Sequence, residues 1–427
     1  MGADVAEIRK SHLNIKFRST CFSVRPVRWF VVVLLSVFAF TGHSIIEIGE
    51  KQNPASKVLV GLVGSGSLRA QTWDALNQDQ RNNLKCVDLT DLGSALSLGV
   101  TKRERILWRS EEWEHSTWSG RREFDTLGFP SLVRNVVGSN PDYRYYLFYA
   151  HHDPTSGIGC AVAESVEGPY KKLADVESGR RDSRVLVCKG RRGDPAHYSS
   201  PCVVWNAEAG LWFMYFHYYK NEWDKGKGHQ KTALATCPDL TKNEWTPWVN
   251  ERGELISVLP TTKENWMNSQ SSYHAIQRLP DGRWLAFLRG TGMAKDSRGI
   301  QVGFPCKLGF ATSADGRRWS YFAENPIIHQ SDGGGGKSGV YRPHFTAILG
   351  DREFLACWSE SDYYDTNPKV IYGKTSDFKI VKRDPRGYAE WPSGDGLVTP
   401  WREENTLYLF SGKYVHSMEL PIKRRYR

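Results

Sequence analysis

An aromatic segment that recurs five times constrains the fold of this chain more than any other feature. The five copies are YRYYLFYAHH from Tyr143, GLWFMYFHYY from Gly210, GRWLAFLRG from Gly282, REFLACWSES from Arg352 and NTLYLFSGK from Asn405. They begin roughly 50 to 70 residues apart, and each is rich in aromatic residues with a period of two. Aromatic runs with this period predict β-strands.

Each aromatic segment is flanked by shorter apolar segments that also predict strands. The preceding ones are FPSLVRNV, SSPCVVWN, SSYHAIQRL, YRPHFTAIL and PSGDGLVTPW, and the following ones are IGCAVAES, TALATCPD, LGFATSADGRRW, VIYGKTSD and YVHSMEL. Repeats of three or four antiparallel strands are typical of β-propeller blades, which cannot bury both faces alone. We therefore predict an all-β fold, a five-bladed β-propeller over residues 104–427. A β-sandwich with similar strand spacing is the alternative.

The N-terminal region predicts a targeting signal. Several Lys and Arg residues precede the apolar run WFVVVLLSVFAF, Trp29 to Phe40, as in a secretory signal or a short anchor. A second candidate cleavage point follows Ala70. We assign residues 1–70 to signal or anchor and linker, and residues 71–103 to a short, partly helical N-terminal extension. The expected location is secreted, periplasmic, or anchored to a membrane and facing outward. The segment RERILWRSEEWEHSTWSG, or the chain end, is expected to supply a strand that completes the propeller.

The charge and the amino-acid composition of the chain limit the kinds of partner and cofactor that we expect. The chain has 427 residues, a net charge of +10 and 16 Trp, and part of its basic excess lies at the two ends. No nucleic-acid-binding motif accompanies that charge, so we expect no nucleic-acid partner. Most of the eight Cys lie in apolar runs and form no CxxC pair, so they are interpreted as small buried residues. We expect no cofactor, and nothing in the sequence supports a structural or axial metal ion such as calcium.

The strand order predicts where a site would lie. In each repeat the first strand begins, and the second strand ends, at the same end of the propeller, because the two strands are antiparallel. The first strands bring to that end Asp125, Phe129, Asp194, His197, Ser272, Tyr273, His274, Tyr341, Arg342, His344, Glu390 and Trp391. The second strands bring His151, His152, Asp153, His217, Tyr218, Arg289, Glu360, Asp362 and Lys413. The hairpins at the opposite end, such as NAEAG and LPDG, carry few such groups. Convergent polar groups with aromatic walls are typical of binding and catalytic sites.

Several of these phrases resemble the five-bladed propeller glycosidases, glycoside hydrolase family 43 and its relatives. The similar text is GFPSLVRN, YYLFYAHHD, GIGCAVAESVEGPYKK, SSPCVVWN, WFMYFHYY and GFATSADGRRW, within roughly residues 104 to 420. The resemblance implies a single-displacement hydrolysis with an Asp base in the first blade, an Asp in the second that tunes the pKa of the acid, and a Glu acid in the third. Asp194 matches the Asp that the resemblance places in the second blade. Phe129 stands at the base position and Ser272 where the Glu is expected, so the chain departs from the family there.

We therefore predict a secreted glycoside hydrolase-like protein that acts on a poly- or oligosaccharide by acid/base hydrolysis. Asp125 or Asp153 would be the base, Asp194 the modulator and Glu360 the acid, while the histidines and Tyr218 bind sugar hydroxyls. The first alternative is a non-catalytic carbohydrate-binding propeller. The second is a sialidase-like enzyme, suggested by SADGRRW and by the candidate arginines Arg134, Arg289 and Arg342. The third is metal-assisted chemistry through His151, His152, His217 and His344.

Overall fold

The computed structural model describes most of the chain after residue 101. The described residues are 102–115, 127–151, 156–177, 179–188, 197–220, 229–264, 266–279, 282–295, 297–298, 301–303, 306–328, 339–349, 353–361, 369–375, 382–390, 398–403, 406–411 and 414–419. The chain divides into two units, Met1–Gln52 and Asn53–Arg427, and every described residue belongs to the second. The predicted leader and the extension up to residue 101 lie outside the described residues. Within the described part, no helix has the length and apolar character needed to cross a membrane.

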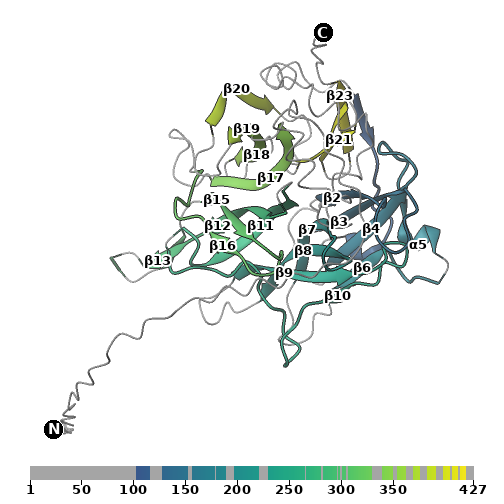
Figure 1. Ribbon diagram of the computed structural model, residues 1–427, viewed down its shortest axis with the longest axis horizontal. Coiled ribbons are helices and arrows are strands. Elements are labelled where there is room, and N and C mark those ends of the chain that lie inside the picture. Colours follow the sequence, from purple (N-terminus) through teal and green to yellow (C-terminus); the bar gives the residue numbers. More distant parts are fainter. Residues whose placement is uncertain are drawn as a thin grey trace, which may run out of the picture. The chain divides into compact units, whose positions relative to one another are not determined.

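The described strands form five antiparallel sheets of four or five strands, which follow one another along the chain, and one separate two-stranded sheet (Figure 1). Sheet 1 contains β2 (Gly128–Arg134), β3 (Tyr145–Ala150), β4 (Gly157–Ala163), β5 (Lys171–Lys172) and β6 (Arg184–Val187). Sheet 2 contains β7 (His197–Asn206), β8 (Leu211–Lys220), β9 (His229–Cys237) and β10 (Thr246–Pro247). Sheet 3 contains β11 (Gln270–Arg278), β12 (Trp284–Thr291), β15 (Lys307–Ser313) and β16 (Ser320–Tyr321), and the hairpin of β13 (Met293–Lys295) and β14 (Gln301–Gly303) follows β12.

Sheets 4 and 5 complete the series. Sheet 4 contains β17 (Gly339–Leu349), β18 (Glu353–Ser361), β19 (Lys369–Thr375) and β20 (Lys382–Glu390). Sheet 5 contains β21 (Val398–Glu403), β22 (Thr406–Ser411), β23 (Tyr414–Glu419) and β1 (Lys102–Arg105). The only described helices are short, η1 (Glu112–Glu114) and α5 (Leu173–Val176). All five aromatic segments predicted as strands are therefore the second strands of their sheets, and the all-β prediction is confirmed.

The first strands of the sheets are neighbours in chain order. β2 packs beside β7, β7 beside β11, β11 beside β17, β17 beside β21, and β21 beside β2. Side-chain hydrogen bonds join some of them: Val203 N donates to Ser131 Oγ over 2.9 Å, and Thr399 Oγ1 donates to Pro130 O over 2.5 Å. The β1 strand pairs with β23, so the N-terminal side of the chain supplies the fourth strand of sheet 5. Successive small sheets with adjoining first strands form a propeller-like arrangement, unlike the two stacked sheets of a sandwich.

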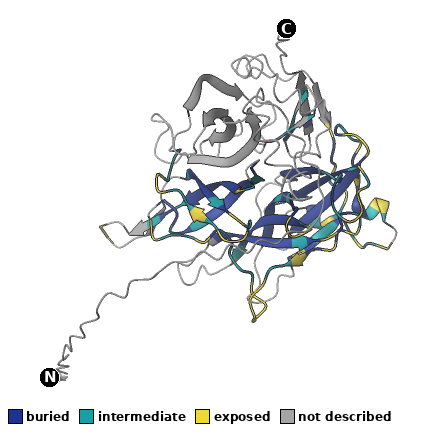
Figure 2. Cartoon of the chain, in the orientation of Figure 1, coloured by how far each residue is buried: buried dark blue, intermediate teal, exposed yellow. Residues whose placement is uncertain are grey.

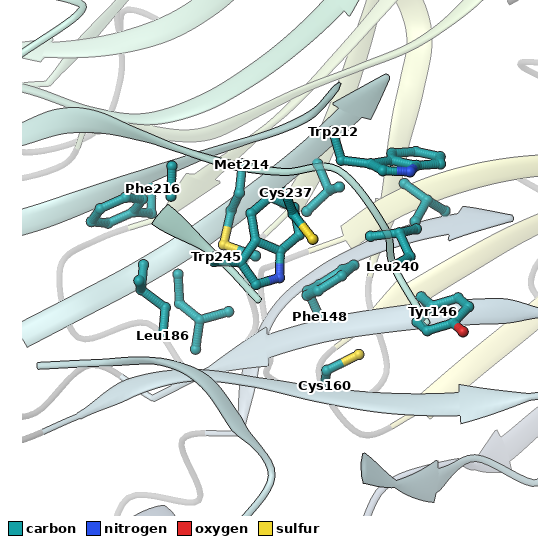
Figure 3. Close-up of a cluster of buried hydrophobic side chains, with 14 of the residues drawn as sticks. Tyr146, Phe148, Cys160, Leu186, Trp212, Met214, Phe216, Cys237, Leu240 and Trp245 are labelled. Carbon is teal, nitrogen blue, oxygen red and sulfur yellow. The ribbon is translucent and has the colours of Figure 1, made fainter. Parts of the chain in front are cut away.

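The core lies between the sheets because the central strands bury both faces. In β8, Trp212, Met214 and Phe216 pack with Phe148 and other residues of sheet 1 (Figure 3). The alternate residues of the same strand, Phe213 and Tyr215, pack with sheet 3 around Trp284 and Ile276. Figure 2 shows the consequence: strands of sheets 1 to 3 are largely buried, while connecting segments are mostly half-buried or exposed. The described cysteines are free thiols, and most are buried among these apolar groups, as predicted.

A buried ion pair anchors the segment between β1 and β2. Glu114 in η1 is fully buried and forms an ion pair with Lys172 of β5. The Glu114 carboxylate also accepts hydrogen bonds from Tyr149 Oη at 2.9 Å and from the backbone N–H of Ser110 and of Glu111. These donors compensate the carboxylate for the loss of water, so removing one partner leaves an uncompensated buried charge.

We expect Lys172→Met to lower the free energy of unfolding by about 3–5 kcal/mol, because it leaves the Glu114 carboxylate buried without its cation. The measurement is urea unfolding followed by tryptophan fluorescence. The double variant Lys172→Met/Glu114→Gln should recover part of the loss. As a control, Glu208→Gln removes a partner of Arg278 that is 49% exposed, and it should cost less than about 1 kcal/mol. A Lys172→Met variant as stable as Glu208→Gln would contradict the assignment.

Candidate functional site

Bulges interrupt the first strands of four sheets at corresponding points, near the end where each strand begins. We call this end of the sheets the site end. The pairing with the second strand shifts between Gly128 and Ser131 in β2, between Ser199 and Cys202 in β7, between Ser272 and His274 in β11, and between Tyr341 and His344 in β17. The register of β21 with β22 runs without a shift. Bulges redirect side chains and are common next to active sites.

Three of the bulges contain a residue with left-handed backbone geometry. The φ angles are 54° for Phe129, 51° for Ser200 and 48° for Tyr273. A residue other than glycine in this region carries about 1–3 kcal/mol of strain, and such residues cluster at functional sites. Phe129 and Ser200 each directly precede a proline, which favours extended backbone at the residue before it, so the sequence gives no local signal for this geometry. From the sequence, Phe129 and Tyr273 are expected at the site end because they lie at the starts of first strands, and Ser200 is missed.

The bulges bring an aromatic and imidazole cluster together from three sheets. The His217 ring lies 4.8 Å from the Tyr273 ring and 6.3 Å from the Phe129 ring, and the Phe129 and Tyr273 rings are 5.7 Å apart. His217 Nε2 lies 3.1 Å from His197 Nε2, so one of these nitrogens donates a proton and the other accepts it. The Tyr219 ring stacks on the His197 ring at 5.5 Å with an interplanar angle of 1°. We call these five residues the ring cluster.

Arg289 borders the ring cluster from β12. Its guanidinium lies 4.1 Å from the centre of the Tyr273 ring, and the residue is 5% exposed. Its Nη2 donates to Gln230 Oε1, Gln270 Oε1 and Ser272 Oγ, each over 2.8 Å. Ser272, which stands where the family resemblance places a Glu acid, therefore helps to orient this arginine.

Burial keeps three histidines of this region neutral at neutral pH. Burial, with a smaller contribution from the nearby His151, lowers the pKa of His197 to about 3. Burial also lowers the pKa of His151 and of His274 to about 4 in each case. Arg109 and Arg184 add to the shift of the His151 pKa, while a hydrogen bond to the Trp113 backbone opposes it. Neutral imidazoles act as hydrogen-bond donors and acceptors and do not supply positive charge.

The structure unites some predicted site residues and separates others. His151, His197 and His217 lie together at the site end. His274 packs between sheets 2 and 3, with Nδ1 3.2 Å from Thr232 Oγ1 and its ring 6.3 Å from that of Tyr215. Tyr218 lies on the opposite face of β8 from His217, in the core cluster with Phe216. That placement corrects the expectation that both residues face one site, since neighbouring strand residues point to opposite faces.

For some of the remaining predicted residues the structure gives the backbone position alone, and the others lie outside the described residues. Arg342 lies within the β17 bulge, His344 resumes the pairing after it, and Glu360 pairs in register with Val340 and Lys369. Seven predicted residues lie outside the described residues: Asp125, His152, Asp153, Asp194, Asp362, Trp391 and Lys413. Asp125 and Asp194 each precede the first residue of a first strand, β2 or β7, by three positions.

Two alternative sites gain no support from the geometry. Among the described residues, no group of three or more His, Cys, Asp or Glu could hold a metal ion. For a sialidase-like arginine triad, Arg134 is the last residue of β2 and pairs with Glu403 over 3.2 Å. Arg289 pairs with Ser272 near the start of β11, at the site end, whereas Arg134 lies at the other end of β2. The length of β2 is roughly 20 Å. These two arginines therefore lie at opposite ends of the sheets.

The SADGRRW turn has a structural role in the described part of the chain. Asp315 accepts hydrogen bonds from the backbone N–H groups of Arg317 and Arg318, and Tyr215 Oη donates to Gly316 O over 2.6 Å. Gly316 has a φ of 72°, and a Cβ there would lie 2.7 Å from Tyr215 Oη. The turn therefore fixes sheet 3 against sheet 2, which accounts for the SADGRRW sequence by a structural role.

Comparison with known proteins finds solved structures that share the fold of this chain. No family model matches the chain. An extracellular endo-alpha-(1->5)-L-arabinanase of Thermotoga petrophila is 33% identical over an 85-residue alignment, and the match covers 17% of this chain and 17% of that protein. A solved structure described as a glycoside hydrolase superposes with a TM-score of 0.52 at 13% identity, over 77% of this chain and 94% of its own.

A second solved structure, described as a BT0996 RGII complex, has a TM-score of 0.52 at 12% identity, over 82% of this chain and 97% of its own. The chain shares the fold of these two structures. The predicted resemblance to the propeller glycosidases is therefore confirmed at the level of the fold, and the arabinanase match agrees with a glycosidase-like chain. The aligned part of the arabinanase covers less than a fifth of that enzyme, so its activity is not transferred by the match alone.

The buried histidines predict a loss of stability in mild acid. Their pKa values are about 3 to 4 in the folded protein and about 6.5 in an unfolded chain, so the unfolded chain binds more protons below pH 6.5. The free energy of unfolding should therefore fall from about pH 6.5 downward, by about 1.4 kcal/mol per pH unit for each such histidine. Urea unfolding between pH 7.5 and pH 5 measures this slope.

A matched variant isolates one contributor to that slope. His197→Gln removes one titrating group, so the variant should lose less stability between pH 6.5 and pH 5 than the wild-type protein. Equal slopes for the two proteins would show that His197 does not remain neutral in the folded state.

Proposed function

We propose that this protein is a secreted glycoside hydrolase that acts on a poly- or oligosaccharide, with the ring cluster at the floor of its site. The observation that carries the proposal is the set of strained bulges at Phe129, Ser200 and Tyr273, at one level of three neighbouring strands. Aromatic faces with nearby neutral imidazoles and an arginine suit a sugar ring, which presents apolar C–H faces and a rim of hydroxyls.

We infer that the five sheets are blades of a five-bladed propeller and that β1 joins the last blade to the start of the chain. The contact of each first strand with the next, and of β21 with β2, supports this reading. In such a ring the bulge of β17 faces the same axial opening as the bulges of the other sheets. Arg342, His344 and Glu360 would then lie on the far side of that opening from Phe129.

In this proposal the acid/base chemistry comes from carboxylates around the floor. Asp125 would be the base, with Asp153 as the alternative, Asp194 the modulator and Glu360 the acid. Asp125 and Asp194 lie on the segments that lead into β2 and β7 at the site end, and Glu360 is the penultimate residue of β18. One carboxyl must be protonated and another ionised, and an inverting reaction requires about 6.5–9.5 Å between them for a water molecule.

Substrate binding would involve residues of the same opening. Sugar hydroxyls would be bound by His151, His152, Asp153, His197, His217, His344 and Arg342, and Trp391 would stack on a ring. The arabinanase relative places linear α-1,5-arabinan first among the substrates to examine. A secreted or outward-facing anchored protein would meet such polymers outside the cell.

We expect the double variant Asp194→Asn/Glu360→Gln to lower kcat for a hydrolysed glycan by at least about 100-fold, because positioned acids and bases contribute roughly 10²–10⁴. Reducing-sugar release from a panel headed by linear arabinan measures it. The melting temperature should stay close to that of the wild-type protein. As a control, Asp175→Asn in the first turn of α5 should keep full activity. Unchanged kcat in the double variant would refute the carboxylate assignment.

A non-catalytic carbohydrate-binding propeller is the second candidate. It is favoured by the side chains at the bulges, because Phe129, Ser200 and Tyr273 are not carboxylic acids. Glycan-array binding by the wild-type protein without release of reducing ends would select this function over hydrolysis.

A further inference from the structure

The bulge of β7 contains two adjacent buried hydroxyl groups that lack hydrogen-bond partners. Ser199 is fully buried and Ser200 is 7% exposed. Within the part of the chain that the structure describes, neither Oγ has a donor or an acceptor in hydrogen-bond range. A buried hydroxyl without a partner is unfavourable, since it loses the hydrogen bonds it makes to water in the unfolded chain.

Other buried serines in the same region have partners. Ser131 Oγ accepts a hydrogen bond from Val203 N over 2.9 Å, Ser156 Oγ donates to Tyr198 O over 3.1 Å, and Ser272 Oγ donates to Gln230 Oε1 over 3.0 Å. Most buried polar groups in folded proteins are satisfied in this way. Among the serines that the structure describes, Ser199 and Ser200 are the two whose buried hydroxyl lacks such a partner.

The pairing of β7 with β8 places Ser199 beside the ring cluster, and Ser200 follows it in the same bulge. Ser199 pairs directly across the strands with His217, whose ring contacts those of Phe129 and Tyr273. Ser200 in β7 has a left-handed φ angle, as do Phe129 in β2 and Tyr273 in β11. The β7 strand packs between β2 and β11. Strain and unsatisfied hydroxyls therefore coincide at one point, where neither improves the stability of the free protein.

We propose that Ser199 and Ser200 bind two adjacent hydroxyl groups of a neutral sugar unit on the floor of the site. This inference rests on the proposed carbohydrate site and names the recognised chemistry. Each serine can donate one hydrogen bond and accept another, as a sugar hydroxyl can. The neighbouring His197 is neutral and the rings of Phe129 and Tyr273 are apolar. The two serines are specificity-determining residues that hold the sugar and transfer no proton.

The test compares Ser199→Ala, Ser200→Ala and the double variant with the wild-type protein. Alanine removes the unsatisfied hydroxyl and has the same difficulty as serine at a φ of 51°, so the free variants should melt at the wild-type temperature or above it. The probes are L-arabinose, D-xylose, D-galactose, D-galacturonate and linear α-1,5-arabinotriose. For the neutral sugars that bind, each substitution should weaken binding by about three- to tenfold in titration calorimetry.

Ser131→Ala is the matched control, because Ser131 is equally buried but satisfied by Val203 N. It should lower the melting temperature and leave the dissociation constant unchanged. If Ser199→Ala and Ser200→Ala lower the melting temperature as Ser131→Ala does, the hydroxyls are satisfied in the free protein and the inference fails. It also fails if the probes bind wild-type and variant proteins equally, or if none of them binds the wild-type protein.

The same proteins separate this inference from the proposed hydrolysis. Weaker sugar binding by the serine variants, with no reducing-end release by any of the proteins, would uphold the serine site and refute the enzyme. Hydrolysis by the wild-type protein with unchanged KM in the serine variants would uphold the enzyme and refute the serine site.

Discussion

Burial of both faces of the central strands is the constraint on which the rest of this structure depends. The aromatic strand β8 packs Met214 and Phe216 against sheet 1 (Figure 3). Phe213 and Tyr215 of the same strand pack against sheet 3. Neither face can be left in water without losing a large apolar contribution, so sheet 2 requires a neighbour on each side. The first strands then lie next to one another, and residues far apart in the chain meet at the site end.

That packing also stabilises the unfavourable features of the site. The left-handed residues Phe129, Ser200 and Tyr273 would not persist in an isolated strand, and the rigid first strands hold them in place. Desolvation by the same packing keeps His197 neutral, and the hydrogen bond between His197 and His217 accommodates a proton on only one of the facing nitrogens. The floor of the site is therefore built from groups suited to binding hydroxyls rather than to transferring protons at neutral pH.

This arrangement divides the work of the proposed enzyme between two kinds of position. Strand residues such as Tyr273 and Arg289 form a fixed surface, because their side chains contact residues from other strands. The carboxylates proposed for catalysis stand at the margins of the strands: Asp125 and Asp194 precede them and Glu360 lies near the end of one. Catalytic groups are often placed on segments that a rigid scaffold positions. The departures from the glycosidase family at Phe129 and Ser272 fall on the fixed surface.

The sequence by itself determined the aromatic strands, their flanking strands and the end of the sheets at which polar residues gather. These features depend on local periodicity, which a strand displays wherever it packs. It also led us to expect His151, His197 and His217 at that end, and His197 and His217 are in contact there. It did not determine which face of β8 carries Tyr218, because GLWFMYFHYY is buried on both faces and shows no polar alternation.

Only the tertiary structure decided the bulges and the groups that meet across sheets. A bulge adds residues to one strand relative to its partner, and whether it forms depends on the pairing as well as on the local sequence. The left-handed geometry of Ser200 and Tyr273 therefore had no clear sequence signal, and Arg289, Gln230 and Ser272 lie too far apart in the chain for their spacing to predict a network. Local sequence specifies which residues form a strand, but packing between strands specifies which side chains share a site.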